Sequence, residues 1–159
     1  MFFTVANAPV VAAPRMAQLI PELTTLGIEE VIVHFSSVSA LRAWELGFDP
    51  ALKEAGIETA WLLDVPTFDN NVVATIWDDP SVNTITPINF DAVTQLQIAL
   101  HADGIAYFDP RPLFCTDGCT IMDALKRPFY FDDDHLTLTG AQQMEQMMDT
   151  IIDQFGPEE

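Results

Sequence analysis

Basic residues are scarce in this chain: 6 lysines and arginines stand against 24 aspartates and glutamates among its 159 residues, giving a formal net charge of −18. A surface this acidic repels the phosphates of nucleic acids and the headgroups of anionic lipids. We therefore expect no nucleic-acid partner and no peripheral membrane binding. We interpret the charge as a well-solvated, self-repelling surface and not as a specific acidic interaction site.

Long hydrophobic runs are also missing, and no stretch reaches the roughly 20 apolar residues of a membrane span. The N-terminal segment is apolar, but it has no basic residue before Arg15 and is interrupted by Pro9 and Pro14. It therefore fits a signal peptide poorly, and we expect neither a signal peptide nor a transmembrane segment. Because 49% of the residues are hydrophobic, a core can form, and the length predicts one domain over residues 1–159.

Cysteine is nearly absent, and the two that occur are Cys115 and Cys119. The intervening Thr-Asp-Gly can close a small loop, and Gly118 helps the backbone to bend. A disulfide in an oxidising compartment and two free thiols in a reducing one both fit this spacing. A metal site is disfavoured because no second Cys or His pair supplies further ligands, so we expect no metal and no cofactor.

What the sequence does contain is an alternation of strand and helix patterns, which predicts an α/β fold with a parallel sheet and helices on its faces. The apolar runs Glu30–Phe35 and Glu58–Leu63 are typical of buried strands, the first buried on both faces. Asp49 is expected to cap a short helix that begins at Pro50. Residues 72–88 are expected to be irregular, because two prolines break them. The other expected elements are strands at Phe2–Val5 and Ile105–Phe108 and helices at Arg15–Leu26, Ser39–Leu46 and Asp91–His101.

The segment 128–143, with the sequence PFYFDDDHLTLTGAQQ, has the strongest functional pattern. Pro128–Phe131 is typical of the end of a strand, and Thr139 is expected to cap a final helix, since the apolar residues after it recur at helical spacing. Asp132 and His135 are then expected on the connection between strand and helix. A carboxylate three residues before a histidine can hold the imidazole as a general base.

Other roles are open for these acidic residues. They can simply favour the N-terminus of the last helix, where negative charge stabilises a helix by a few tenths to about 1 kcal/mol. A calcium loop is a weaker alternative, because the glycine and distal glutamate of an EF-hand do not follow Asp132 at the right spacing. Asp133 and Asp134 are second choices as partners of the histidine, since residues adjacent to Asp132 are expected to face elsewhere.

The same segment resembles the last conserved block of the SGNH hydrolase superfamily. The resemblance is strongest to the SGNH domain fused to membrane-bound acyltransferases that O-acylate cell-surface glycans. In that family the block reads approximately Tyr-x-Asp-Asp-Asp-His-Leu-Ser, followed by Gly-Ala. A short Cys-x(n)-Cys element usually precedes it, which favours a disulfide between Cys115 and Cys119. The residues that match the block are Tyr130, Asp132, Asp133, Asp134, His135, Leu136, Thr137, Gly140 and Ala141.

The resemblance implies a three-layer α/β/α, flavodoxin-like fold in which a serine attacks an acyl ester, His135 takes its proton and Asp132 orients the imidazole. The family's serine lies in a Gly-Asp-Ser block on the first strand, and that tripeptide occurs nowhere in this sequence. We therefore expect an SGNH domain that lacks its first strand and helix and is inactive or nearly so alone. The sheet left exposed predicts marginal stability or self-association.

Ser36 and Ser37 are possible substitute nucleophiles, because they follow a predicted strand, and the carboxyl ends of parallel strands line the cleft of open α/β sheets. No Gly-x-Ser-x-Gly elbow surrounds them, and Ser39 is expected to be a helix N-cap. No residues can be assigned to an oxyanion hole, since Asn70 and Asn71 are more typical of a turn.

By resemblance, the expected function is acyl-ester chemistry on glycan hydroxyls, either O-acetyl transfer or esterase-type hydrolysis in polysaccharide modification. The implied partners are a cell-surface glycan or another acyl-ester substrate and a membrane acyltransferase domain. The implied location is the periplasm. The alternative, from a different class of function, is a non-catalytic binding or interaction module on a degenerate SGNH fold.

Overall fold

The structure, a computed structural model, describes residues 2–4, 12–116 and 118–155, and side chains within 18–36, 39–116 and 118–154. It separates into two compact units. The first unit comprises Met1–Asp64 and Asp91–Phe108, and the second comprises Val65–Phe90 and Asp109–Glu159. Among the helices of the described residues, none combines the length and the apolar character that a membrane span requires.

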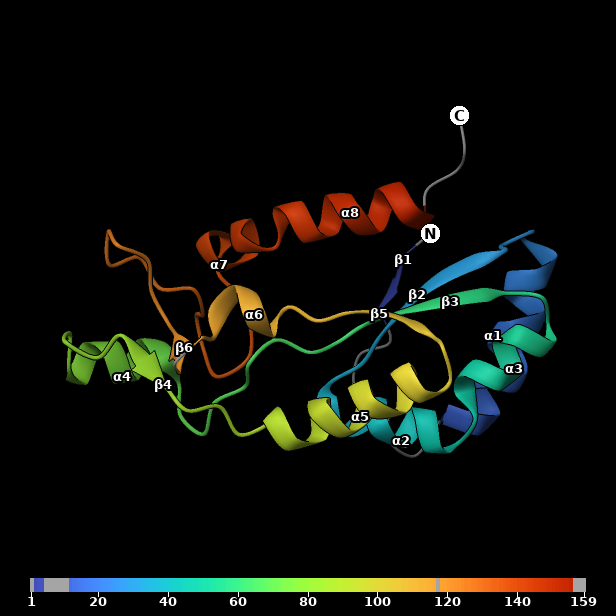
Figure 1. Ribbon diagram of the computed structural model, residues 1–159, viewed down its shortest axis with the longest axis horizontal. Coiled ribbons are helices and arrows are strands. Elements are labelled where there is room, and N and C mark those ends of the chain that lie inside the picture. Colours follow the sequence, from blue (N-terminus) through green and yellow to red (C-terminus); the bar gives the residue numbers. More distant parts are fainter. Residues whose placement is uncertain (1, 5–11, 117, 156–159) are drawn as a thin grey trace. The chain divides into compact units, whose positions relative to one another are not determined.

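The first unit is built on a parallel sheet (Figure 1). Its strands β1 (Phe2–Thr4), β2 (Glu30–His34), β3 (Glu58–Leu62) and β5 (Ala106–Phe108) lie in the order β1-β2-β3-β5, and each pairs in parallel with the next. Helices precede or connect these strands: α1 (Ala12–Thr25), α2 (Ser37–Glu45), α3 (Phe48–Glu54) and α5 (Phe90–Ala102). The predicted α/β fold with a parallel sheet is therefore confirmed.

The core of the first unit lies between the sheet and its helices. Ala60 and Trp61 are adjacent in β3 and both are buried, so the centre of this strand is covered on both faces. In β2, by contrast, burial alternates: Val31 and Val33 are buried and Ile32 is only half-buried. The prediction that this strand is buried on both faces is wrong in that respect. Helices contribute Leu23, Ala40, Ala43, Leu52, Val93, Leu96 and Leu100 to the same cluster.

The sequence pattern predicted that Asp49 caps a helix, and this prediction is wrong. Helix α3 begins two residues before the expected Pro50, at Phe48, after Gly47 in the left-handed conformation with φ 76°. Asp49 is buried, and its carboxylate accepts hydrogen bonds from Thr59 Oγ1 and from Trp61 Nε1 on β3. The side chain therefore holds α3 against the sheet, because a buried carboxylate needs such donors.

The second unit contains two short antiparallel strands and four helices within its described residues. The strands are β4 (Thr84–Ile85) and β6 (Cys119–Thr120), and the helices are α4 (Val72–Asp78), α6 (Arg111–Phe114), α7 (Leu138–Gln143) and α8 (Glu145–Phe155). The prediction that residues 72–88 are irregular is thus wrong. Asn71 starts α4, because its side chain accepts a hydrogen bond from Ala74 N at 2.9 Å and Val72 is fully buried.

Aromatic rings form the centre of this second unit. Tyr130 is fully buried, with its ring centroid 5.0 Å from that of Phe68 and 5.7 Å from that of Phe114. The Phe114 centroid is in turn 5.8 Å from that of Phe129. Burying rings of this size contributes about 1.5–3 kcal/mol each, with a further gain of about 0.5–1.5 kcal/mol for edge-to-face pairs. Two of these rings, Phe129 and Tyr130, belong to the segment that the sequence marked as functional and anchor the backbone just before Asp132.

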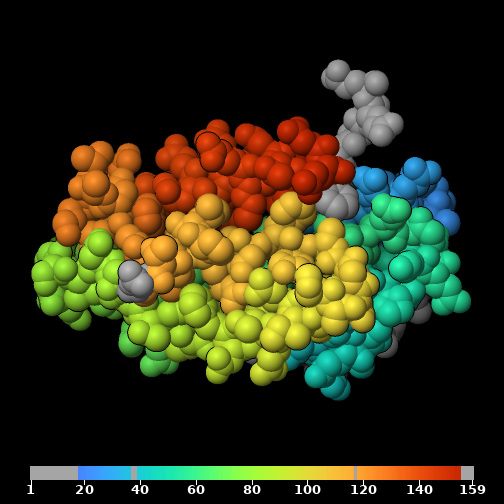
Figure 2. Space-filling model, viewed as in Figure 1, coloured from blue at the N-terminus to red at the C-terminus, as the bar shows by residue number. Residues whose placement is uncertain are grey.

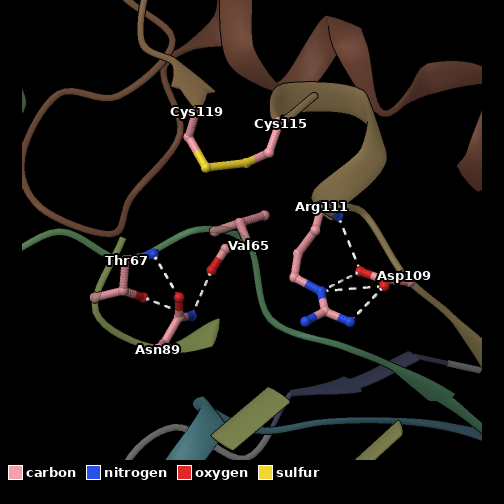
Figure 3. The surroundings of a disulfide bond; sticks show 7 residues. All are labelled: Val65, Thr67, Asn89, Asp109, Arg111, Cys115 and Cys119. Carbon is pink, nitrogen blue, oxygen red and sulfur yellow. Dashed lines mark hydrogen bonds and ion pairs between the residues drawn. A yellow bond between two sulfur atoms is a disulfide. The ribbon is translucent and has the colours of Figure 1, made fainter. Parts of the chain in front are cut away.

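A disulfide joins Cys115, at the end of α6, to Cys119 in β6 (Figure 3). Near it, the guanidinium of Arg111 donates to both carboxylate oxygens of Asp109, at 2.7–3.1 Å. On the other side of the view, Asn89 accepts from Thr67 N at 3.0 Å and donates to Val65 O at 2.8 Å. These contacts hold the start of α6 and the segment after Val65 in place.

Reduction of the disulfide is expected to lower the free energy of unfolding by about 2 kcal/mol, the entropy of closing so short a loop. Thermal denaturation with and without dithiothreitol measures the effect. A double variant, Cys115→Ser with Cys119→Ser, is the control, because its melting temperature should not respond to the reductant. If dithiothreitol leaves the melting temperature of the unaltered chain unchanged, the bond does not contribute to stability.

Candidate active site

A tight loop in the second unit carries the candidate acid–base pair. Its ends are held by a bridge between Tyr130 and Leu136 and by a hydrogen bond from Phe131 N to His135 O at 3.0 Å. The segment 128–131 forms isolated bridges and not the predicted end of a regular strand. Short pairing is sufficient here because the adjacent rings are buried in the aromatic core.

Asp132 organises this loop from within. Its Oδ1 accepts hydrogen bonds from Asp134 N at 3.1 Å and from His135 N at 2.8 Å. Its Oδ2 lies 2.9 Å from His135 Nδ1. The three-residue spacing is therefore sufficient to bring the two side chains together. The turn in which Oδ1 accepts the backbone N–H groups also directs Oδ2 at the imidazole. The predicted pairing of these two side chains is present in the structure.

The loop is attached to the rest of the second unit through its backbone. Phe68 N donates to Asp133 O at 2.9 Å, and Val72 N, at the start of α4, donates to Asp132 O at 3.0 Å. Figure 2 shows the orange surface of the segment before α7 lying beside the green surface of α4. The start of α4 and the segment before it therefore hold both carbonyl groups, and these two hydrogen bonds fix the position of the whole loop.

The cap of helix α7 lies two residues before the predicted cap. Thr137, and not Thr139, is the N-cap of α7, since its Oγ1 accepts from Gly140 N at 3.2 Å. Thr137 Oγ1 also donates to Pro128 O at 2.6 Å, which favours this residue as the cap. The first turn of α7 contains no acidic residue. The aspartates therefore do not serve the helix N-terminus, which was the structural alternative for them.

Charge shapes the titration of both members of the pair. The hydrogen bond that His135 donates to Asp132, together with the negative charges of Asp134 and Asp132, raises the pKa of His135 above its ordinary value. Partial burial by itself raises the pKa of Asp132, but the N–H groups of His135 and Asp134 and the imidazole outweigh it. The pKa of Asp132 consequently lies below its ordinary value. The carboxylate stays ionised while the imidazole holds its proton more firmly.

Asp134 is closer to the histidine than the sequence predicted. Its Oδ1 lies 2.7 Å from His135 Nδ1, so the expectation that residues adjacent to Asp132 face elsewhere is wrong for this residue. The loop is tight enough to bring a second carboxylate back to the ring. The Asp134 side chain is 45% exposed, against 26% for Asp132. Solvent therefore screens the attraction between Asp134 and the imidazolium more than that between Asp132 and the imidazolium.

Asp132→Asn is expected to lower the pKa of His135 more than Asp134→Asn does. The amide oxygen of asparagine can still accept the two backbone N–H groups, so the loop is retained while the charge that favours the imidazolium is lost. Titration of the imidazole signals by NMR measures both variants. An equal or larger decrease for Asp134→Asn would make Asp134 the dominant partner.

Asp132, Asp134 and His135 also place one possible ligand atom each within 4.8 Å of one another. The imidazole nitrogen beside the two carboxylates is Nδ1, which is hydrogen-bonded to Asp132. Both carboxylates thus face the same imidazole nitrogen, and we assign no metal ligands here.

The serines considered as substitute nucleophiles lie in the first unit. Ser36 is the N-cap residue of α2, a position predicted for Ser39, and its exposed Oγ donates to Ser39 Oγ at 3.2 Å. The side chain of Ser37 lies outside the described residues. A role for either serine stays a prediction. Asn71, which the sequence placed in a turn, caps α4.

Two contributions at this site were not predicted from the sequence. One is the carboxylate of Asp134; the other is Phe131, whose ring stacks on His135. Asn89 in the second unit was also missed, although it is buried and bridges Val65 and Thr67. A lone asparagine has no sequence signal for such a role, whereas an aromatic residue four positions before a histidine is a pattern that can be recognised.

A family model described as the SGNH domain fused to AT3 domains matches residues 48–150. The chain belongs to the SGNH domain family. The match extends over parts of both units and includes the whole of the loop with Asp132 and His135. No curated protein shows significant sequence similarity to this SGNH domain.

Solved structures support the same fold. One is the periplasmic domain of the lipopolysaccharide acetyltransferase of Salmonella serovar Paratyphi A, with a TM-score of 0.62 and 18% identity over 86% of this chain. The SGNH domain described here spans 61% of the length of that periplasmic-domain chain. Another, from Bacteroides fragilis and assigned to the acylhydrolases, has a TM-score of 0.58 and 12% identity over 92% of this chain and 72% of its own. Family and neighbours together associate the SGNH domain with acyl-ester chemistry in general.

Proposed function

We propose that His135 is the general base, and Asp132 its orienting carboxylate, in acyl-ester chemistry on glycan hydroxyls. The observation that carries the proposal is the contact between Asp132 Oδ2 and His135 Nδ1 at 2.9 Å. A proton on Nδ1 is held by the carboxylate, so Nε2, on the opposite side of the ring, presents its lone pair. The His135 side chain is 66% exposed, which leaves it accessible to a reacting group.

In the proposed reaction, Nε2 takes the proton of a serine hydroxyl as its oxygen attacks the ester carbonyl carbon. The alcohol of the substrate then leaves with that proton, and an acyl-serine remains. A sugar hydroxyl or a water molecule next loses its proton to Nε2 and attacks the acyl carbonyl carbon, and the serine oxygen leaves with that proton. Transfer and hydrolysis differ only in this second acceptor, and Asp132 stabilises the imidazolium in both steps.

The proposed reaction needs a nucleophilic serine, and the Gly-Asp-Ser block that carries it in the family is absent from the sequence. We propose that the SGNH domain functions with a nucleophile from a further segment or chain and that these 159 residues alone are inactive or nearly so. A recruited Ser36 or Ser37 would be the exception. Residues 1–159 then form a single SGNH-like domain without its nucleophile segment.

Substrate and location are proposed from the relatives. The Salmonella neighbour is a periplasmic domain of a lipopolysaccharide acetyltransferase, and the family description names fusion to AT3 domains. We propose O-acetyl groups on a cell-surface glycan as the substrate, a membrane acyltransferase domain as the partner, and the periplasm as the location. The disulfide between Cys115 and Cys119 fits an oxidising compartment.

The test compares p-nitrophenyl acetate hydrolysis by the purified chain and by a chimera in which the Gly-Asp-Ser segment of an active SGNH domain precedes it. We expect a rate close to that of buffer for the chain and turnover that depends on His135 for the chimera. Turnover of the chimera without any dependence on His135 would refute the proposed base. His135-dependent turnover by the chain alone would point to a nucleophile within it, and Ser36→Ala and Ser37→Ala would then locate it.

The absence of Gly-Asp-Ser also favours a second candidate, a glycan-binding or interaction module without catalysis. It predicts that no chimera gains turnover and that the chain binds a glycan with equal affinity whether or not His135 is present.

A further inference from the structure

The residue just before the three aspartates is in direct contact with the proposed base. The ring of Phe131 stacks on the imidazole of His135, with centroids 5.4 Å apart and planes 21° from parallel. The same two residues are joined by the backbone hydrogen bond that closes the loop. Phe131 and His135 are thus joined through both their side chains and their main chains, although the side chain of Phe131 is 54% exposed.

An exposed aromatic side chain has a cost, because its apolar surface stays in water. Burial therefore does not account for the position of Phe131. Stacking on an imidazole does, for two physical reasons. A flat ring restricts rotation of the imidazole about its own bond to Cβ, and the negative π face attracts the positive charge that the imidazole acquires when it takes a proton.

Resting on the function proposed for His135, we propose that Phe131 is a positioning residue for the base. Its ring acts as a flat support that keeps Nδ1 directed at Asp132 and Nε2 directed outward, and it favours the imidazolium formed during proton transfer. The carboxylate sets one edge of the imidazole and Phe131 sets its plane. One contact at the edge of the ring and one on its face together determine an orientation that either one alone leaves free.

The charges that act on His135 from the described residues are those of its own loop: Asp132, Asp134 and, more weakly, Asp133. The contacts that Asp132 and Asp134 make are to Nδ1, at the edge of the imidazole, whereas a stacked ring lies against its face. Removing Phe131 leaves these charges in place, and its effect can therefore be measured separately from theirs.

The experiment is an NMR titration of the imidazole in the full chain, with Phe131→Ala, Phe131→Leu and Phe131→Tyr beside the unaltered protein. We expect the alanine and leucine variants to lower the pKa of His135 and to reduce the ratio of Nδ1–H to Nε2–H tautomer by about two- to tenfold, as expected for the loss of a ring–ring contact. Phe131→Tyr keeps a flat ring and is expected to behave like the unaltered protein.

Leu138→Ala is the matched control, because Leu138 is another exposed apolar residue close to His135 in the sequence, 78% exposed at the start of α7. It should leave the titration unchanged, and melting temperatures should show that all variants are folded. A leucine variant equal to the unaltered protein, or a Leu138→Ala effect as large as that of Phe131→Ala, would overturn the proposal. Because the readout needs no turnover, this result is independent of the outcome for acyl-ester chemistry.

Discussion

His135→Ala is expected to lower kcat/KM for p-nitrophenyl acetate by about 10²- to 10⁴-fold in the Gly-Asp-Ser chimera, the usual contribution of a positioned general base. The loss should fall on kcat, because the imidazole acts on a proton that moves only in the transition state. Without His135, the loop has no imidazole left to take that proton.

The pH dependence gives the same prediction a second readout. A base functions only when neutral, and the hydrogen bond that His135 donates to Asp132 raises the pKa of His135. Activity should therefore increase with pH through a midpoint above the ordinary histidine value, and His135→Ala should remove that inflection. His101→Ala is the control, because this exposed histidine ends α5 in the first unit. If both variants lose activity equally, the effect is not specific to the proposed base.

Gly140→Ala is expected to destabilise the chain by about 3 kcal/mol, the upper range for forcing an additional methyl group into a packed site. A Cβ at this position would overlap the carbonyl oxygen of Phe129 and would lie 3.0 Å from Leu136 Cδ2. The carbonyl cannot retreat without loss, because it accepts from Thr137 N at 2.8 Å. Steric overlap therefore outweighs the gain of about 1 kcal/mol that alanine has over glycine inside a helix.

Urea denaturation measures this change, with Gln142→Ala as the control in the same helix. Gln142 is exposed, so its replacement is expected to alter the free energy of unfolding by less than about 0.5 kcal/mol. A Gly140→Ala variant as stable as the unaltered chain would show that α7 can shift away from Phe129. The imidazole titration of His135 in the same variant would reveal whether such a shift reaches the loop.

Features with a local physical cause were predictable from the sequence. The alternation of apolar runs and helical periodicity predicted the parallel α/β fold, because strand and helix patterns depend on neighbouring residues. The pairing of Asp132 with His135 was predictable for the same reason. A three-residue spacing brings both side chains to one turn, and the contact at 2.9 Å needs no distant residue.

Errors arose where residues distant in the sequence determined the outcome. Asp49 precedes a proline and has the pattern of a helix cap, yet donors from Thr59 and Trp61, ten and twelve residues later, draw it into the core. Thr137 is preferred over Thr139 as the cap of α7 partly because its hydroxyl reaches the backbone of Pro128. Local propensity cannot distinguish two threonines when a tertiary contact favours one.

By itself, the sequence determined the family, the parallel sheet and the contact between Asp132 and His135, because each depends on residue types at short spacing. The folded loop brought the ring of Phe131 onto the imidazole and a second carboxylate, from Asp134, to Nδ1. Tertiary structure also decided how the loop is held, through the bonds from Phe68 and Val72 to its carbonyls. These contacts depend on where a folded backbone places its groups in space, and spacing along the chain does not specify that.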